Sequence, residues 1–145
     1  MIKLNTMANK IFLGIFVLLI LFSVSVSAKR VKFQISTVVP AARGYVKITQ
    51  DKNRNYEIGI KLTDMAEVSR LEPSKLLYIV WMVTEEGVTK NMGKIDSSTG
   101  FLSSKLKASF ETVTSFNPIH IFITAEDDPS LQYPGNQLII STGKF

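Results

Sequence analysis

The sequence contains no cysteine and a single histidine, His120. The absence of cysteine excludes disulfide bonds, iron–sulfur clusters and zinc sites that need thiolates. A Ser-His-Asp triad would have to use His120, and the chain has no G-x-S-x-G nucleophile elbow. A glycine-rich phosphate loop is also missing. We therefore expect a protein that is not an enzyme and that uses neither a cofactor nor a metal.

The longest apolar run lies near the N-terminus, at residues 11–22. Lys3 and Lys10 precede this run, and a stretch of small residues ending at Ala28 follows it. A basic start, an apolar centre and a small-residue end are typical of a secretory signal peptide. We predict cleavage after Ala28, with residues 1–28 as the signal and residues 29–145 as one domain in the periplasm or outside the cell.

A membrane anchor is the alternative interpretation of the same segment. Residues 11–28 just reach the length of a membrane-spanning helix. However, three serines dilute its last turns, and a basic cluster at residues 29–32 follows it directly. An anchor in this orientation would place that cluster on the outer side, against the usual charge bias. Cleavage is therefore favoured, and inner-membrane anchoring through this segment stays the alternative.

Few features of the mature domain favour a nucleic-acid partner. Lys3 and Lys10 are the only charged residues of segment 1–28, so removing it reduces the formal net charge from +5 to +3. Nucleic-acid binding usually needs a denser basic patch with aromatic platforms. An exported domain with neither disulfides nor an N-x-[ST] site also favours a bacterial source. We expect a partner that is a protein or an envelope component, and no nucleic acid.

Alternation of apolar and polar residues, interrupted by turn residues, dominates the mature chain. It predicts an all-β fold, an antiparallel immunoglobulin-like β-sandwich of seven to eight strands. The turn-forming DKNRN stretch predicts a hairpin between the second and third strands, and residues 63–74 predict a connection with one short helical turn. The expected strands are residues 31–36, 44–50, 55–62, 76–84, 88–95, 105–113, 118–126 and 138–142.

The run 76–84 is apolar at both alternating sets of positions. Such a run indicates a central strand that is covered on both faces, or one whose second face is covered by a loop. Trp81 lies in this run, and we expect it to be buried in the core. An exposed Trp81 that stacks on carbohydrate is the less favoured alternative.

Residues 51–55 match the first half of a calcium-binding loop, with Asp51, Asn53 and Asn55 at the ligand spacing. The second half does not match, because Tyr56 occupies the glycine position and Leu62 the position of the bidentate acid. A hairpin turn is therefore the prediction.

Two acidic clusters occur at predicted turns, at residues 85–86 and 126–128. Two carboxylates could serve a small hydrolase built on Glu126 or Asp128, but only across a cleft. A weak cation site is a further alternative. Solvated turns are the favoured interpretation, because short loops leave little room for a cleft.

The loop between the last two predicted strands is the best candidate for binding a partner. It starts with Glu126, Asp127 and Asp128, and it carries Leu131 and Tyr133 among polar residues. Its prolines and glycine stiffen it, and a tyrosine on a rigid loop supplies contact area at low entropic cost. The alternative is that Leu131 and Tyr133 fold back and close the open end of the sandwich.

Short motifs in residues 76–142 resemble the extracytoplasmic domain of the anti-sigma-K factor family. They are Y-x-x-W (Tyr78, Trp81), N-x-G (Asn91, Gly93), I-T-A-E (Ile123 to Glu126) and P-G (Pro134, Gly135). The resemblance implies a β-sandwich outside the cytoplasmic membrane. The ten residues before the apolar run lack the zinc ligands of the family's sigma-binding part. Beside an exported non-catalytic binding domain, we therefore keep a freestanding anti-sigma-factor-like envelope regulator as the alternative.

Overall fold

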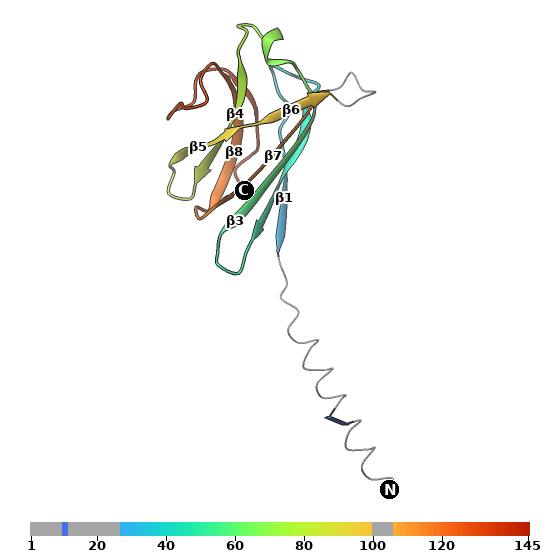
Figure 1. Cartoon of the computed structure of the whole chain (residues 1–145), viewed down its shortest axis with the longest axis vertical. Coiled ribbons are helices and arrows are strands. Elements are labelled where there is room, and N and C mark those ends of the chain that lie inside the picture. The colour runs from blue at the N-terminus through green and yellow to red at the C-terminus, as the bar shows by residue number, and fades with distance from the viewer. Residues whose placement is uncertain (1–9, 12–26, 100–105) are drawn as a thin grey trace.

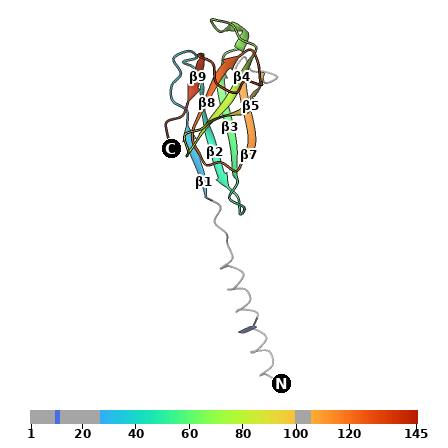
Figure 2. The same cartoon turned by 90° about the vertical axis from the view of Figure 1, so that its left-hand side faces the viewer.

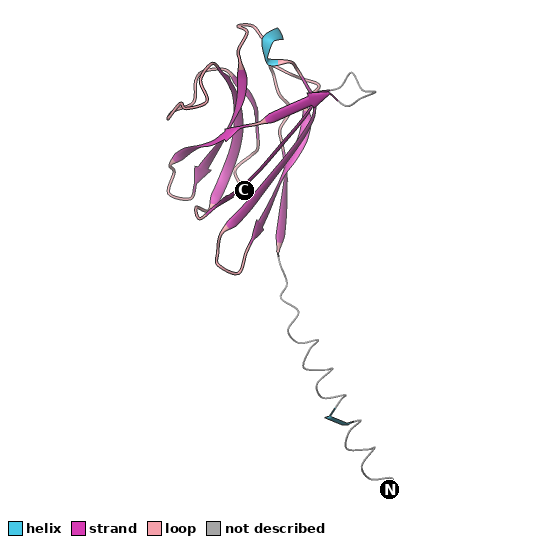
Figure 3. Cartoon of the chain, viewed as in Figure 1, coloured by secondary structure: helices cyan, strands magenta, loops and turns pink. Residues whose placement is uncertain are grey.

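A computed structural model describes residues 10–11, 27–99 and 106–145. Within them, nine strands form two antiparallel sheets that pack face to face (Figures 1 and 3). The first sheet has the order β1 (Ala28–Lys32), β2 (Arg43–Gln50), β3 (Tyr56–Met65), β7 (Leu106–Thr114) and β6 (Asp96–Thr99). The second has the order β5 (Thr89–Lys94), β4 (Leu77–Thr84), β8 (Pro118–Glu126) and β9 (Leu138–Ser141). The predicted fold class, an all-β antiparallel sandwich, is confirmed.

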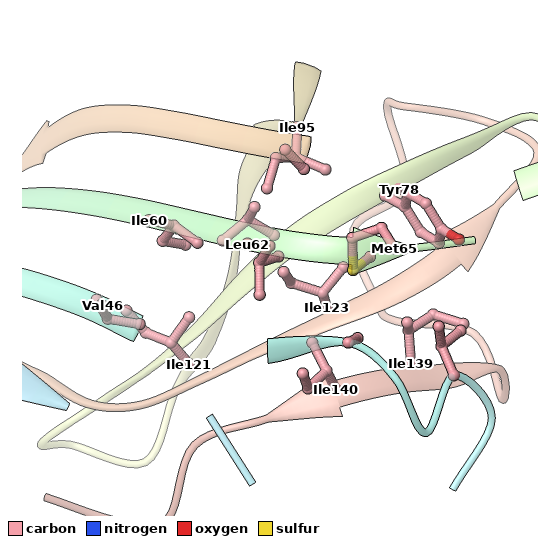
Figure 4. Packing of buried hydrophobic residues seen from close by; sticks show 14 of the residues in the cluster. Val46, Ile60, Leu62, Met65, Tyr78, Ile95, Ile121, Ile123, Ile139 and Ile140 are labelled. Atoms are coloured by element: carbon pink, nitrogen blue, oxygen red, sulfur yellow. The ribbon is translucent and has the colours of Figure 1, made fainter. Parts of the chain in front are cut away.

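The core lies between the two sheets (Figure 4). Val46 and Ile60 from the first sheet and Ile121 and Ile123 from the second are almost completely buried. Alternation puts the charged residues of β3 on the opposite face of its sheet. The predicted hairpin between the second and third strands is confirmed by the pairing of β2 with β3.

The predicted strand 31–36 is divided between the two sheets. β1 ends at Lys32 and runs along the edge of the first sheet beside β2 (Figure 2). Beyond it, the amide of Gln34 donates to the carbonyl of Ser141 at 2.8 Å, and the hydroxyl of Ser36 donates to the carbonyl of Ile139. Residues 33–36 therefore cross from the first sheet to β9. Alternation could not indicate this crossing, because it does not specify which edge a strand pairs with.

Residues 96–99, which lie between the predicted strands 88–95 and 105–113, form β6 and pair with β7. A strand at a sheet edge needs backbone pairing on one side only, so a polar sequence can form it. This strand raises the number in the described residues above the predicted seven or eight.

The connection after β3 contains a single 3₁₀ turn, η1 (Val68–Arg70). Met65, which lies within the predicted connection 63–74, belongs to β3 instead. The turn is held against the core by Tyr78, whose hydroxyl donates to the carbonyl of Ala66 at 2.8 Å. Burial raises the pKa of Tyr78 to about 12.

The predicted signal segment lies almost wholly outside the described residues, of which only Lys10, Ile11, Ser27 and Ala28 belong to it. No helix in the described part of the chain is long and apolar enough to cross a membrane. β1 begins at Ala28, the residue before the predicted cleavage site. Lys29 to Lys32 each pair with a residue of β2, and these pairs do not depend on the presence of Ala28.

Candidate functional site

The loop between β8 and β9, residues 127–137, folds back over the outer face of the second sheet (Figure 1). The side-chain amide of Asn91 on β5 donates to the carbonyls of Pro129 at 3.0 Å and Leu131 at 2.8 Å. β5 lies beyond β4 when counted from β8, so the loop reaches back across the sheet. The ends of this loop are therefore held by β8 and β9, and its middle is held by β5.

Trp81 is completely buried, as expected, but it does not lie between the two sheets. Its neighbours Val80 and Met82 belong to the central cluster, so alternation turns Trp81 to the outer face. There its ring stacks against Phe122 on β8, with centroids 6.4 Å apart. Of our two interpretations of the apolar run, the one in which a loop covers the second face agrees with the structure.

A chain of buried hydrogen bonds connects Trp81 to the loop. The indole Nε1 of Trp81 donates to Oγ1 of Thr124 at 2.8 Å, and that hydroxyl donates to Oε1 of Glu126 at 2.6 Å. The amide of Gly135 donates to the same Oε1 at 2.8 Å. Buried polar groups need partners of this kind, because an unpaired one costs about 1–3 kcal/mol. This network ties the loop to the sheet.

Gly135 allows the loop to approach the carboxylate this closely. A Cβ atom at this position would lie 2.6 Å from Oε2 of Glu126. The P-G sequence of the loop therefore has a local structural reason, which is contact with Glu126 rather than chain reversal alone.

The three acids at the start of the loop point to different partners. Glu126 is only 4% exposed and belongs to the network. Asp127 forms an ion pair with Lys75 at 2.6 Å. Asp128 accepts from the amide and the hydroxyl of Ser130, at 2.8 and 2.7 Å, and these bonds lower its pKa. Among the described residues, no cluster of His, Asp and Glu could hold a metal ion.

The two acidic turns lie at opposite ends of the second sheet. Glu126 pairs with Leu77 at the start of β4, whereas Glu85 follows the end of β4 and accepts from the side-chain amide of Asn117. At ~3.3 Å per residue along a strand, they lie roughly 26 Å apart. Glycosidase carboxylates lie about 5–9.5 Å apart. These two turns therefore cannot serve as a carboxylate pair.

The turn at residues 51–55 has the predicted hairpin geometry. Oδ1 of Asp51 accepts from the amides of Asn53 and Asn55, each at 2.8 Å, and Oδ2 accepts from the side chain of Asn55 at 3.0 Å. These bonds lower the pKa of Asp51. The carboxylate therefore holds the turn in the way expected of an aspartate that starts one.

His120 lies on the outer face of β8, half-buried, with its ring tilted against Phe122 at 5.5 Å between centroids. Burial is the main cause that lowers its pKa, and Lys144 adds to this effect. No acid of the described residues forms an ion pair with it within 4.0 Å.

Tyr133 and Leu131 have different environments. Tyr133 is 79% exposed, so the alternative in which it folds back and closes the end of the sandwich is wrong for this residue. Leu131 is half-buried, and its carbonyl accepts from Asn91. Leu76, 74% exposed, lies at the same end of the sheet, because its amide donates to the carbonyl of Glu126. A shallow hollow of about 360 Å³, lined by Lys75 and Glu126 among others, opens there.

Sequence reasoning missed the role of Asn91, which holds the loop, and of Thr124, which links Trp81 to Glu126. The N-x-G motif was the available signal, since the amide of Gly93 donates to Oδ1 of Asn91 at 2.8 Å and fixes that side chain. Most of the short motifs from the second half of the chain thus meet at this loop. No protein-family model, curated protein or solved structure matches the chain.

Proposed function

We propose that this protein is an exported, non-catalytic binding domain whose loop between β8 and β9 contacts a protein or envelope component. The observation that carries this proposal is Tyr133, a large side chain that is almost fully exposed on a loop held from below. Soluble proteins tolerate single exposed apolar residues. A tyrosine on a preorganised loop, however, loses little entropy on binding and is a frequent source of binding energy.

The neighbourhood of Tyr133 supports a contact surface larger than one side chain. Leu76 and Leu138 are also exposed at this end of the second sheet. Lys75 and Asp127 contribute an exposed ion pair beside them. Apolar anchors surrounded by charged groups are the usual composition of a protein interface.

The test is capture of partners from an envelope extract by the wild-type protein and by Tyr133→Ala. We expect Tyr133→Ala to reduce capture at least severalfold while the melting temperature stays unchanged, because the side chain is exposed. Val113→Ala, an exposed apolar position on the first sheet, is the matched control. Unchanged capture by Tyr133→Ala would refute a contact at this loop.

Export is a separate part of the proposal and has its own measurement. Intact mass of the protein recovered from the periplasm should correspond to a chain that starts at Lys29. A mass that retains residues 1–28, found in the membrane fraction, would establish the anchored form instead.

A freestanding envelope regulator is the second candidate function. It is favoured by one observation, which is that residues of the short anti-sigma-like motifs, Trp81, Asn91, Glu126 and Gly135, lie together around one loop. The two candidates differ in the captured partner. A component of a sigma-factor or sensor system would support the regulator, and any other envelope protein would support the general binding domain.

A further inference from the structure

A groove of about 530 Å³ lies on the outer face of the first sheet, on the side of the molecule away from the β8–β9 loop. We call it the basic groove. Its lining includes four cations and two aromatic residues but no acid of the described residues: Arg30, Lys32, Arg43, Lys61, Tyr45 and Phe33, the last of which packs against the core.

The strand register explains why these cations meet. Lys32 on β1 and Lys61 on β3 both pair with Tyr45 on β2, so the two lysines flank the tyrosine. With strands ~4.8 Å apart, their backbones are roughly 10 Å apart. Arg30 lies two residues before Lys32 on the same face of β1.

Both guanidinium groups of the groove are held in place by neighbouring groups. Arg30 lies 4.0 Å from the centroid of the Tyr45 ring, a cation–π contact. Nη1 of Arg43 donates to the carbonyls of Pro40 and Ala42 at 2.6 and 2.7 Å. Each guanidinium keeps further N–H groups, and a planar fork of donors fits phosphate oxygens in pairs.

The cations of the groove form no ion pair with an acid in the described part of the chain. The ion pairs that the described residues form, Glu67 with Arg70 and Lys75 with Asp127, lie outside the groove. The other half of the same sheet face differs, since Glu57 and Glu111 line a hollow there together with Lys47. Like charges held together repel one another, and a bound anion would relieve that repulsion.

We propose that the basic groove binds a linear polymer that carries repeated phosphate groups. Four cations spread over three strands exceed what a single phosphate needs, which favours several linked anions. A nucleic acid is disfavoured because Arg30 already occupies one face of the Tyr45 ring and Tyr45 is half-buried, which leaves little of the ring for a base to stack on. A lipid surface is disfavoured because neither aromatic side chain is free to insert: Tyr45 is half-buried, and Phe33 packs against the core. The groove does not depend on the function proposed for the loop.

The experiment measures binding of inorganic polyphosphate to the full chain, in the form recovered from cells, at low salt. We expect Arg30→Gln and Lys61→Gln each to weaken binding on the order of tenfold, the loss of one charge-assisted contact. The matched control is Lys52→Gln in the exposed β2–β3 turn, which removes the same charge and should change binding less than about twofold. Tyr133→Ala should leave it unchanged. A melting curve for each variant confirms that it is folded.

Two further probes separate the sources of phosphate. A single-stranded oligonucleotide of matched charge and vesicles of phosphatidylglycerol are compared with polyphosphate in wild type and Lys61→Gln. Tighter Lys61-dependent binding of either probe than of polyphosphate overturns the proposal in favour of a nucleic acid or a membrane. Equal losses in Lys61→Gln and Lys52→Gln, or no binding of polyphosphate, also overturn it.

Discussion

The two sheets of this protein have outer faces of opposite character. On the first sheet, Lys47, Gly59 and Lys61 face outward behind the buried Ile60. On the second sheet, the outward-facing Trp81 is as deeply buried as the core residues behind it. The difference arises because residues 127–137 cover the second sheet, whereas no described segment covers the first in the same way.

The loop of residues 127–137 adds a third layer to the two-layer sandwich, locally, over the second sheet. A sheet face that is covered can consist of apolar side chains. The polar atoms buried beneath the loop then need hydrogen-bond partners, which Glu126 and Thr124 supply. An open face instead bears charge. The outer face of the first sheet is thus open along its strands, whereas the outer face of the second is covered by the loop around Trp81.

The largest effect is expected at the centre of the covered face. Trp81→Ala should lower the free energy of unfolding by about 3–5 kcal/mol, because it opens a cavity and removes the indole donor. Denaturant unfolding measures this, with Phe116→Ala, an exposed aromatic position, as the control. A cost below about 1 kcal/mol would mean that the loop does not cover Trp81 in solution.

A smaller effect is expected where the loop meets the sheet. Glu126→Ala should cost about 1–3 kcal/mol, because it leaves the Thr124 hydroxyl and the Gly135 amide without their acceptor. Glu126→Gln keeps an oxygen at that position and should cost less. Unfolding and amide exchange at Gly135 measure the two variants. Equal costs would show that the charge of Glu126 matters more than its acceptor oxygen.

The two faces should respond with opposite signs to the same change at a glycine. Gly59 on the open face has no atom within 4 Å of an added Cβ, so Gly59→Ala should stabilise the protein by about 0.5–1 kcal/mol. Gly135→Ala should destabilise it, because the Cβ would meet the Glu126 carboxylate. Thermal unfolding of both variants tests the pair, and a destabilising Gly59→Ala would contradict an open face.

The smallest effect concerns His120, on the second sheet beyond the covered part. Burial lowers its pKa below the usual 6.5, so the folded state disfavours the protonated ring. Its contribution to stability is therefore complete above about pH 6.5 and is lost as the pH falls through the lowered value. In His120→Gln, the free energy of unfolding should depend slightly less on pH in this range. An identical profile in the variant would assign the change to other groups.

Local patterns predicted the second and third strands well, because residues 44–62 contain both strands and the turn that joins them. Burial of Trp81 also followed from its apolar run. The position of its cover did not, because that depends on bonds between Asn91 and residues about 40 positions away. For the candidate site, the sequence left open whether Tyr133 contacts a partner or closes the end of the sandwich, and only the structure shows that its side chain is 79% exposed.

The amino-acid sequence alone specified the fold class, since alternation and turn residues act within a few positions of the chain. It also determined the turn at Asp51, whose bonds are local. The tertiary structure decided the crossing of residues 33–36 to β9, the cover over Trp81 and the basic groove. Each of these joins segments distant in sequence, and which segments meet depends on sheet order and register, which local preferences do not specify.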